Sequence, residues 1–328
     1  MYGNLYDQID QAIEQIQSGK VGEGLAQLQM VMTYAKEDPD LAFQLADIFY
    51  ELGHADTALS LIRDIEPFFD ELSTDTQIEI HTLRAEMMID MGQLDQAMDE
   101  LLSCIELEPD HVRSAILLAD IYLMQNLPEI ACKYLEGIIE QNPDELDVAF
   151  ILSEIYSDMG LWEKALSLLE SLEDSEYKDK VKISKGRILS QTGRFEQAYS
   201  LFQQALEDDP EQVDALVGCA LTALQLNENE EAMIYCDRLL ELEQDHLGAY
   251  QMKGDALQKE NRLEEAKVIY EQALERNDQE EVILLKLIEV SSLLADMDEA
   301  ERYVELLLEL DDENEVALQW KSRITHQI

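Results

Sequence analysis

Carboxylates are the residues of this chain that are most able to do chemistry. The sequence has 72 Asp and Glu against 23 Lys and Arg in 328 residues, a formal net charge of −49. Carboxylates act as general acids and bases, as metal ligands and as partners for cations. With so many acids, some pairs lie close by chance, so proximity alone does not indicate a catalytic dyad.

The other reactive residue types show no catalytic or metal-binding spacing. Five histidines are scattered along the chain: His54, His81, His111, His246 and His326. None belongs to an HExxH motif, and the sequence has no phosphate-binding Gly-rich loop, GxSxG or dinucleotide fingerprint. Acidic triplets such as Asp296-Met297-Asp298 lack the glycine and terminal glutamate of a calcium loop. The sequence therefore predicts no enzyme, no metal and no cofactor.

The cysteines and the first residues bear on location. The four cysteines, Cys104, Cys132, Cys219 and Cys236, form no CxxC pair, and three of them fall at inward-facing helical positions. We expect buried free thiols there. The opening MYGNLYDQID has neither a basic region nor an apolar core, so no signal peptide is predicted. Both observations favour the cytoplasm.

The acidic charge excludes two classes of partner. Nucleic acids and anionic membranes are bound by cations, so a chain this acidic is expected to be repelled from both. An excess of acid is also typical of a solvated outer face. A halophilic origin would give the same excess of acid. However, the predicted core keeps full-sized Leu, Ile and Met residues, and this argues against such an origin.

Small residues recur at a nearly constant interval and reveal the elements that carry these acids. Most are 34 residues apart: Gly24, Ala58, Ala97, Ala131, Ala165, Ala198, Ala232, Ala266 and Ala300. Five residues before each stands Gly19, Gly53, Gly92, Asn126, Gly160, Gly193, Asn227, Asn261 or Ala295. Gly and Asn tolerate the left-handed backbone that ends a helix. Each unit is therefore predicted to be a helix, a tight turn and a second helix.

This pattern resembles the tetratricopeptide repeat family, which has a 34-residue helix–turn–helix unit. The best match runs from Val112 to Pro143, with Ala119, Tyr122, Asn126, Ala131, Leu135 and Ile138 at the family's spacing. The first and last units depart from it, at Gly24 and at Ile288 and Ala295, as terminal repeats often do. Because there is no appended module, the chain looks like a stand-alone bacterial protein of this family, of the Gram-positive type.

The resemblance implies an all-α fold, a right-handed α-solenoid of about nine repeats plus a capping helix at 315–328. We expect one superhelix over residues 1–328. The repeats are predicted to begin near residues 5, 39, 78, 112, 146, 179, 213, 247 and 281. Two irregular spacings, at Glu66–Gln77 and Glu173–Lys180, are interpreted as bends of the superhelix or as a longer helix end or surface loop.

In this family the first helix of each repeat lines a concave groove. The ninth residue of repeats two to five is then a carboxylate in every case: Asp47, Glu86, Asp120 and Glu154. Further acids flank this ladder, and apolar residues alternate with it. The whole predicted groove comprises Asp40, Phe43, Asp47, Glu51, Glu79, Glu86, Asp90, Ile116, Asp120, Asp147, Phe150, Glu154 and Asp158.

Such a ladder favours a cationic partner. Carboxylates about 10 Å apart repel by roughly 0.4 kcal/mol in bulk water and about 1.7 kcal/mol at an effective dielectric near 20. A bound basic, partly apolar segment of another protein would relieve that repulsion. The sequence thus predicts a protein-binding scaffold or adaptor, the alternative being that the acids merely form a solvated face. The Lys/Asn clamp with which some relatives hold a terminal carboxylate is not expected, because these positions carry Asp and Glu.

One local exception is basic. Six cations fall between Lys178 and Arg194, and Lys180 and Arg187 are predicted to face the groove of the sixth repeat. They form a secondary basic patch or simply pair with neighbouring acids, each exposed pair being worth about 0–1 kcal/mol. An alternative function follows from this patch: self-assembly, in which the terminal repeats or the basic sixth repeat contact another copy.

Overall fold

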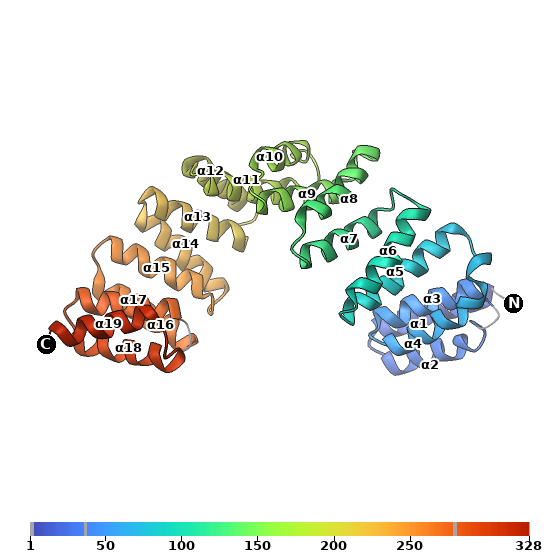
Figure 1. Ribbon diagram of the computed structural model, residues 1–328, viewed down its shortest axis with the longest axis horizontal. Coiled ribbons are helices and arrows are strands. Elements are labelled where there is room, and N and C mark those ends of the chain that lie inside the picture. The colour runs from blue at the N-terminus through green and yellow to red at the C-terminus, as the bar shows by residue number, and fades with distance from the viewer. Residues whose placement is uncertain (1–2, 36–37, 278–280, 328) are drawn as a thin grey trace. The chain divides into compact units, whose positions relative to one another are not determined.

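The protein is all-helical throughout the residues that the computed structural model describes, 3–35, 38–277 and 281–327. Most helices pack against a helix that is consecutive in the chain, in antiparallel pairs (Figure 1). The helices are α1 (Gly3–Gln17), α2 (Val21–Met32), α3 (Pro39–Glu51), α4 (Ala55–Ile65), the 3-10 helix η2 (Glu66–Glu71), α5 (Thr74–Asp90), α6 (Leu94–Leu107), α7 (Val112–Met124), α8 (Pro128–Gln141), α9 (Leu146–Asp158), α10 (Trp162–Ser171), α11 (Lys178–Gln191), α12 (Phe195–Asp208), α13 (Val213–Leu226), α14 (Asn229–Leu242), α15 (Leu247–Lys259), α16 (Leu263–Arg276), α17 (Glu281–Leu293), α18 (Met297–Leu310) and α19 (Glu315–Gln327).

Two compact units divide the chain, Met1–Ile155 and Tyr156–Ile328, and the boundary falls within α9. The first unit has buried clusters around Leu45 and Leu101, and the second has one around Phe202 and Tyr270. The single superhelix over residues 1–328 stays a prediction.

The turn inside each repeat has the expected left-handed backbone. All nine residues at this position have positive φ: Gly19, Gly53, Gly92, Asn126, Gly160, Gly193, Asn227, Asn261 and Ala295. The amide of the next residue closes the turn, as in the 2.8 Å bond from Arg194 N–H to Leu189 C=O. This is the backbone pattern that ends a helix and reverses the chain.

Ala295 is the one alanine in this left-handed set (φ 59°). A Cβ in that conformation costs about 1–2 kcal/mol. We therefore expect Ala295→Gly to raise the free energy of unfolding by about 1 kcal/mol, measured by urea titration. As a control, Ala26→Gly on the exposed side of α2 lowers it by about 1 kcal/mol, because helical backbone favours alanine. Destabilisation by Ala295→Gly would contradict this account of the turn.

Helix pairs approach each other at the small residues of the repeat. Ala12, Ala46, Ala58 and Ala97 have no exposed surface. The first repeat carries Gly24 where the other repeats have alanine, and the structure gives the reason. A Cβ there would lie 2.6 Å from the Ala12 carbonyl oxygen and 2.5 Å from Ile16 Cγ1. Gly24 thus allows α1 and α2 to pack more closely than the later pairs could with alanine.

Aromatic rings fill the equivalent space in the second unit. The Phe202 ring lies against both Gly186 and Gly218, where an added Cβ would come within 2.7 Å and 2.5 Å of it. The Tyr270 ring lies against Gly254, with a corresponding distance of 2.2 Å. Phe202 is 2% exposed and Tyr270 is 0% exposed, so these rings are part of the core.

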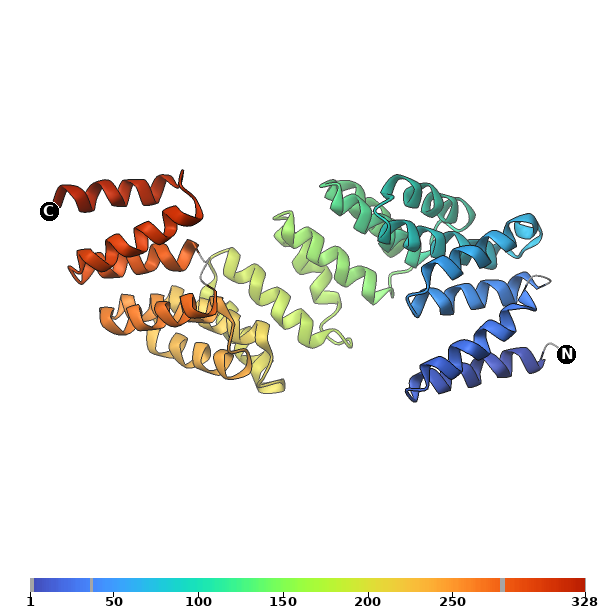
Figure 2. The ribbon, with the colours of Figure 1, turned by 90° about the horizontal axis from the view of Figure 1, so that it is seen from below.

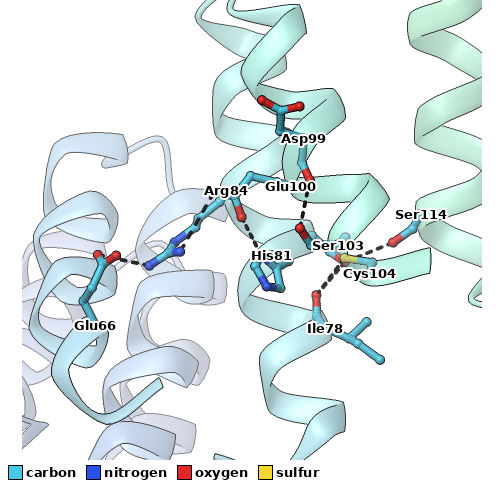
Figure 3. A network of polar contacts seen from close by, with 10 residues as sticks. Glu66, Ile78, His81, Arg84, Asp99, Glu100, Ser103, Cys104 and Ser114 are labelled. Atoms are coloured by element: carbon cyan, nitrogen blue, oxygen red, sulfur yellow. Dashed lines mark hydrogen bonds and ion pairs between the residues drawn. The ribbon is translucent and has the colours of Figure 1, made fainter. Parts of the chain in front are cut away.

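The extra residues between the second and third repeats fold onto α5. Phe69 of η2 packs edge-on against His81 with ring centroids 5.0 Å apart, and Gln77 donates a 2.9 Å hydrogen bond to the Phe69 carbonyl. Arg84 reaches back to Glu66 at 3.2 Å, while His81 contacts Glu100 of α6 at 2.5 Å (Figure 3). Because Ser73 caps the helix, α5 begins at Thr74, four residues before the repeat start predicted near Ile78.

All four cysteines lie in the interior of the protein. Cys104, Cys219 and Cys236 are buried free thiols, as expected, and burial raises the pKa of Cys219 and of Cys236 to about 12. Within the described ranges, no helix is both long enough and apolar enough to span a bilayer.

Candidate functional site

The predicted groove residues of the first unit lie on α3, α5, α7 and α9, the first helices of repeats two to five. Their exposure divides them into two groups. The exposed members are Asp40, Glu51, Glu79, Asp90, Asp120 and Asp147. The half-buried members are Phe43, Asp47, Glu86, Ile116, Phe150 and Glu154. Asp158, in the second unit, is exposed at the end of α9.

An open pocket of 580 Å³ brings two of these residues together. Glu86 comes from α5 and Ile116 from α7, and the remaining lining comes from α7 and from the loops before α7 and α9. The lining residues that the sequence pattern did not predict are Glu108, Asp110, His111, Val112, Arg113, Leu117, Asn142 and Glu145. One feature of the sequence could have indicated part of this lining: an acid stands just before a first helix, as at Asp110 and Glu145. The repeat positions that predicted the groove all lie inside the helices.

Arg113 is the cation of this pocket, and it changes the interpretation of the ladder. Its guanidinium donates two hydrogen bonds to the Glu86 carboxylate, Nε at 2.8 Å and Nη2 at 2.9 Å. Such fork-like pairing is the strongest geometry available to Arg and a carboxylate. The Glu86 side chain is 17% exposed and that of Arg113 is 63% exposed. Glu86 is therefore already paired with a cation, whereas Arg113 is largely open to solvent.

Two other acids of the predicted groove, Asp90 and Asp120, differ in their surroundings. The Tyr50 hydroxyl of α3 donates a 2.6 Å hydrogen bond to Asp90 Oδ2 of α5, and burial together with that bond raises the Tyr50 pKa. Desolvation by partial burial raises the pKa of Asp120, although its side chain still reaches solvent. Asp120 thus takes up a proton at a higher pH than an ordinary aspartate. A cation bound near it would favour the charged form.

The pocket combines carboxylates with an apolar wall. Four acids line it, Glu86, Glu108, Asp110 and Glu145, beside Val112, Ile116 and Leu117. The polar groups are partly fixed, since His111 Nδ1 lies 2.7 Å from Ser114 Oγ and Asn142 donates to Asp110 Oδ2 at 3.3 Å. In the part of the chain that the structure describes, no group of three His, Cys, Asp or Glu is arranged to hold a metal. The arrangement is suited to holding a cation next to an apolar side chain.

The predicted basic patch lies in the second unit, on α11. Lys180 and Arg187 are exposed there, and the Lys180 ammonium sits 5.4 Å from the centre of the Tyr177 ring. The neighbouring lysines pair within the unit: Lys182 contacts Asp179 at 3.4 Å and also Asp208, and Lys185 contacts Glu173. Much of the local positive charge is therefore balanced by acids of the same unit.

Repeated antiparallel helix pairs with left-handed turns and small residues at the contacts define a helical-repeat scaffold. Tetratricopeptide repeat models match residues 78–111, 189–254 and 247–280, and two of these segments begin where repeats are predicted, at Ile78 and Leu247. These matched segments are tetratricopeptide repeats, and the predicted α-solenoid of such repeats is confirmed. Repeats of this family are protein-interaction modules and are generally not catalytic.

Three known proteins illustrate the similarity. The TPR repeat-containing protein YpiA of Bacillus subtilis (strain 168) is 25% identical over 307 residues, covering 92% of this chain and 70% of YpiA. A tetratricopeptide repeat protein from Parabacteroides merdae ATCC 43184 has a TM-score of 0.58 at 15% identity, covering 76% of this chain and 98% of that one. YrrB, described as a TPR protein with an unusual peptide-binding site, gives a TM-score of 0.47 at 18% identity, covering 57% of this chain and 97% of YrrB. The Bacillus relative agrees with the expected resemblance to proteins of Gram-positive bacteria.

Proposed function

We propose that this chain is a cytoplasmic adaptor whose first unit binds a basic, partly apolar segment of another protein. The observation that carries the proposal is the 580 Å³ pocket, where four carboxylates surround an apolar wall. Of the residues lining it, Arg113 and His111 are the only basic ones. A Lys or Arg side chain therefore has carboxylates to meet, and a neighbouring Leu, Ile or Phe can contact Val112 and Ile116.

The internal pair between Glu86 and Arg113 supports this mode of binding a partner cation. It demonstrates that the Glu86 carboxylate accepts a guanidinium with both oxygens at ordinary hydrogen-bond distances. Arg113 is 63% exposed, so little packing holds it in place. A partner arginine can replace it, and the acids on either side, Asp47 and Asp120, extend the same preference along the groove.

Reversing two ladder charges tests the proposal. We expect Asp47→Lys with Glu86→Lys to weaken binding of a short peptide of alternating Lys and Leu by at least about tenfold, because attraction becomes repulsion. Fluorescence anisotropy of the labelled peptide measures this. Binding of the wild type is also expected to weaken at high salt, and a peptide of alternating Glu and Leu should not bind.

The matched control moves the same charge change outside the groove. Asp64 on α4 and Glu106 on α6 are exposed acids of second helices. Asp64→Lys with Glu106→Lys is expected to leave most of the affinity in place. Equal losses in the two double variants would reduce the effect to net charge and rule out the acidic groove as the site.

Self-assembly is the second candidate, through the terminal repeats or through the basic patch of Lys180 and Arg187. Pairing of Lys182 and Lys185 with acids of their own unit reduces the charge that this patch could offer another copy. Light scattering during gel filtration separates the two candidates, since only self-assembly raises the mass with protein concentration.

A further inference from the structure

A second pocket, of 420 Å³, lies near the C-terminal end of the second unit. It is formed by α17 and α19, which belong to the group of helices beside the C-terminus (Figure 1, Figure 2). Its apolar lining consists of Val282, Leu285, Leu293, Val316 and Trp320. Three of these remain well exposed: Val282 and Val316 at 45% and Leu293 at 57%. Such exposure of clustered apolar side chains is characteristic of a contact surface.

The repeat pattern shows that this surface is a local departure. The second residue of the repeat is charged in every repeat from the second to the seventh: Asp40, Glu79, Arg113, Asp147, Lys180 and Asp214. The same position then becomes Gly248, Val282 and Val316. A solvated face would keep its charges to the end of the array. The exposed valines therefore favour a function other than solubility.

The charges around the pocket restrict its occupant. Lys286 forms an ion pair with Asp255 at 2.8 Å, and Glu281 accepts a 2.8 Å hydrogen bond from Asn314. Arg323 lies with its guanidinium 5.4 Å from the centre of the Trp320 ring. The exposed carboxylate of Glu289 lines the pocket and, in the part of the chain that the structure describes, forms no ion pair. The site thus offers one uncompensated negative charge beside an apolar wall.

We propose that this pocket binds an apolar side chain of a partner protein segment that carries a Lys or Arg next to it. The apolar side chain lies between Val282, Leu293 and Val316 and contacts Trp320, and the cation pairs with Glu289. All lining residues belong to the second unit, so the site is distinct from the acidic groove of the first unit. The two sites can be tested, and can fail, separately.

Trp320 gives a direct readout. The chain has two tryptophans, so Trp162→Phe leaves Trp320 as the only one. Short acetylated peptides with a Phe-Leu pair between lysines are titrated into this variant, beside peptides with Ala-Ala or with flanking glutamates. We expect a saturable shift of Trp320 emission with the Lys-flanked Phe-Leu peptide, and at least tenfold weaker binding of the other two.

Substitutions in the pocket complete the test. Leu293→Asp and Glu289→Lys are each expected to weaken the Lys-flanked Phe-Leu peptide at least tenfold. Leu242→Asp, an equally drastic change at a 41% exposed residue of α14 outside the pocket, should leave its affinity unchanged. Circular dichroism verifies that each variant is folded. The double variant Asp47→Lys with Glu86→Lys should leave the peptide-induced shift of Trp320 emission unchanged.

Three results would overturn the proposal. The first is the absence of any saturable shift at millimolar peptide. The second is equal binding of the Lys-flanked and Glu-flanked peptides. The third is a shift that follows protein concentration without peptide, which would assign the pocket to a second copy of the chain.

Discussion

Phe202→Ala is expected to lower the free energy of unfolding by about 3–5 kcal/mol, the usual cost of emptying a well-packed aromatic site. Phe202 is 2% exposed, and its ring lies against two glycines, Gly186 and Gly218. Neither glycine has a side chain that could move into the vacated space. The cavity therefore stays open, and the loss falls toward the upper part of that range. Urea unfolding followed by circular dichroism measures it.

Phe68→Ala is the matched control for this prediction. Phe68 lies in η2 and is 40% exposed, so its truncation removes little buried surface and is expected to cost less than about 1 kcal/mol. If the two variants unfold at the same urea concentration, Phe202 is not the core residue that its packing indicates.

Gly254→Ala is expected to cost about 3 kcal/mol, at the high end of overpacking effects. The new Cβ would lie 2.2 Å from the Tyr270 ring. That ring is fully buried, and its hydroxyl donates a 2.6 Å hydrogen bond to Asp255, so moving it also breaks a bond to a carboxylate. The same urea titration measures the loss.

Gly137→Ala on α8 makes the same chemical change with the opposite expected sign. Nothing lies within 4 Å of the Cβ that would be added there. Alanine is a better helix former than glycine, so this variant should be more stable by up to about 1 kcal/mol. A gain in stability at both positions would show that the contact at Gly254 relaxes without cost.

The regular features of the fold could be predicted because they repeat. Small residues and left-handed turns recur at one spacing, and each depends only on backbone geometry that any repeat must satisfy. The close packing at Gly24 could not be foreseen in this way, because it depends on the separation of one particular helix pair. The early start of α5 was missed for a similar reason, since it arises from a cap at Ser73 in the inserted segment.

The site was predictable only in part. The repeat positions identified Glu86 and Ile116, which line the pocket, but not their environment. The role of Arg113 could not be predicted, because it is a single cation among acids and its bond to Glu86 depends on side-chain direction across two repeats. The place of Trp320 in an exposed apolar pocket could not be predicted, because it depends on Val282 and Leu293, which are distant in sequence.

Several carboxylates of the first helices also connect one repeat to the next. Glu86 holds Arg113 of the following repeat, Asp90 accepts a hydrogen bond from Tyr50 of the preceding one, and Asp255 is bound to Lys286. A partner cation that binds Glu86 must therefore displace Arg113 and so break this contact between the third and fourth repeats. Under the proposed function, binding of the partner and the stiffness of the first unit are therefore coupled, and a force that separates these two repeats would change the affinity for the partner.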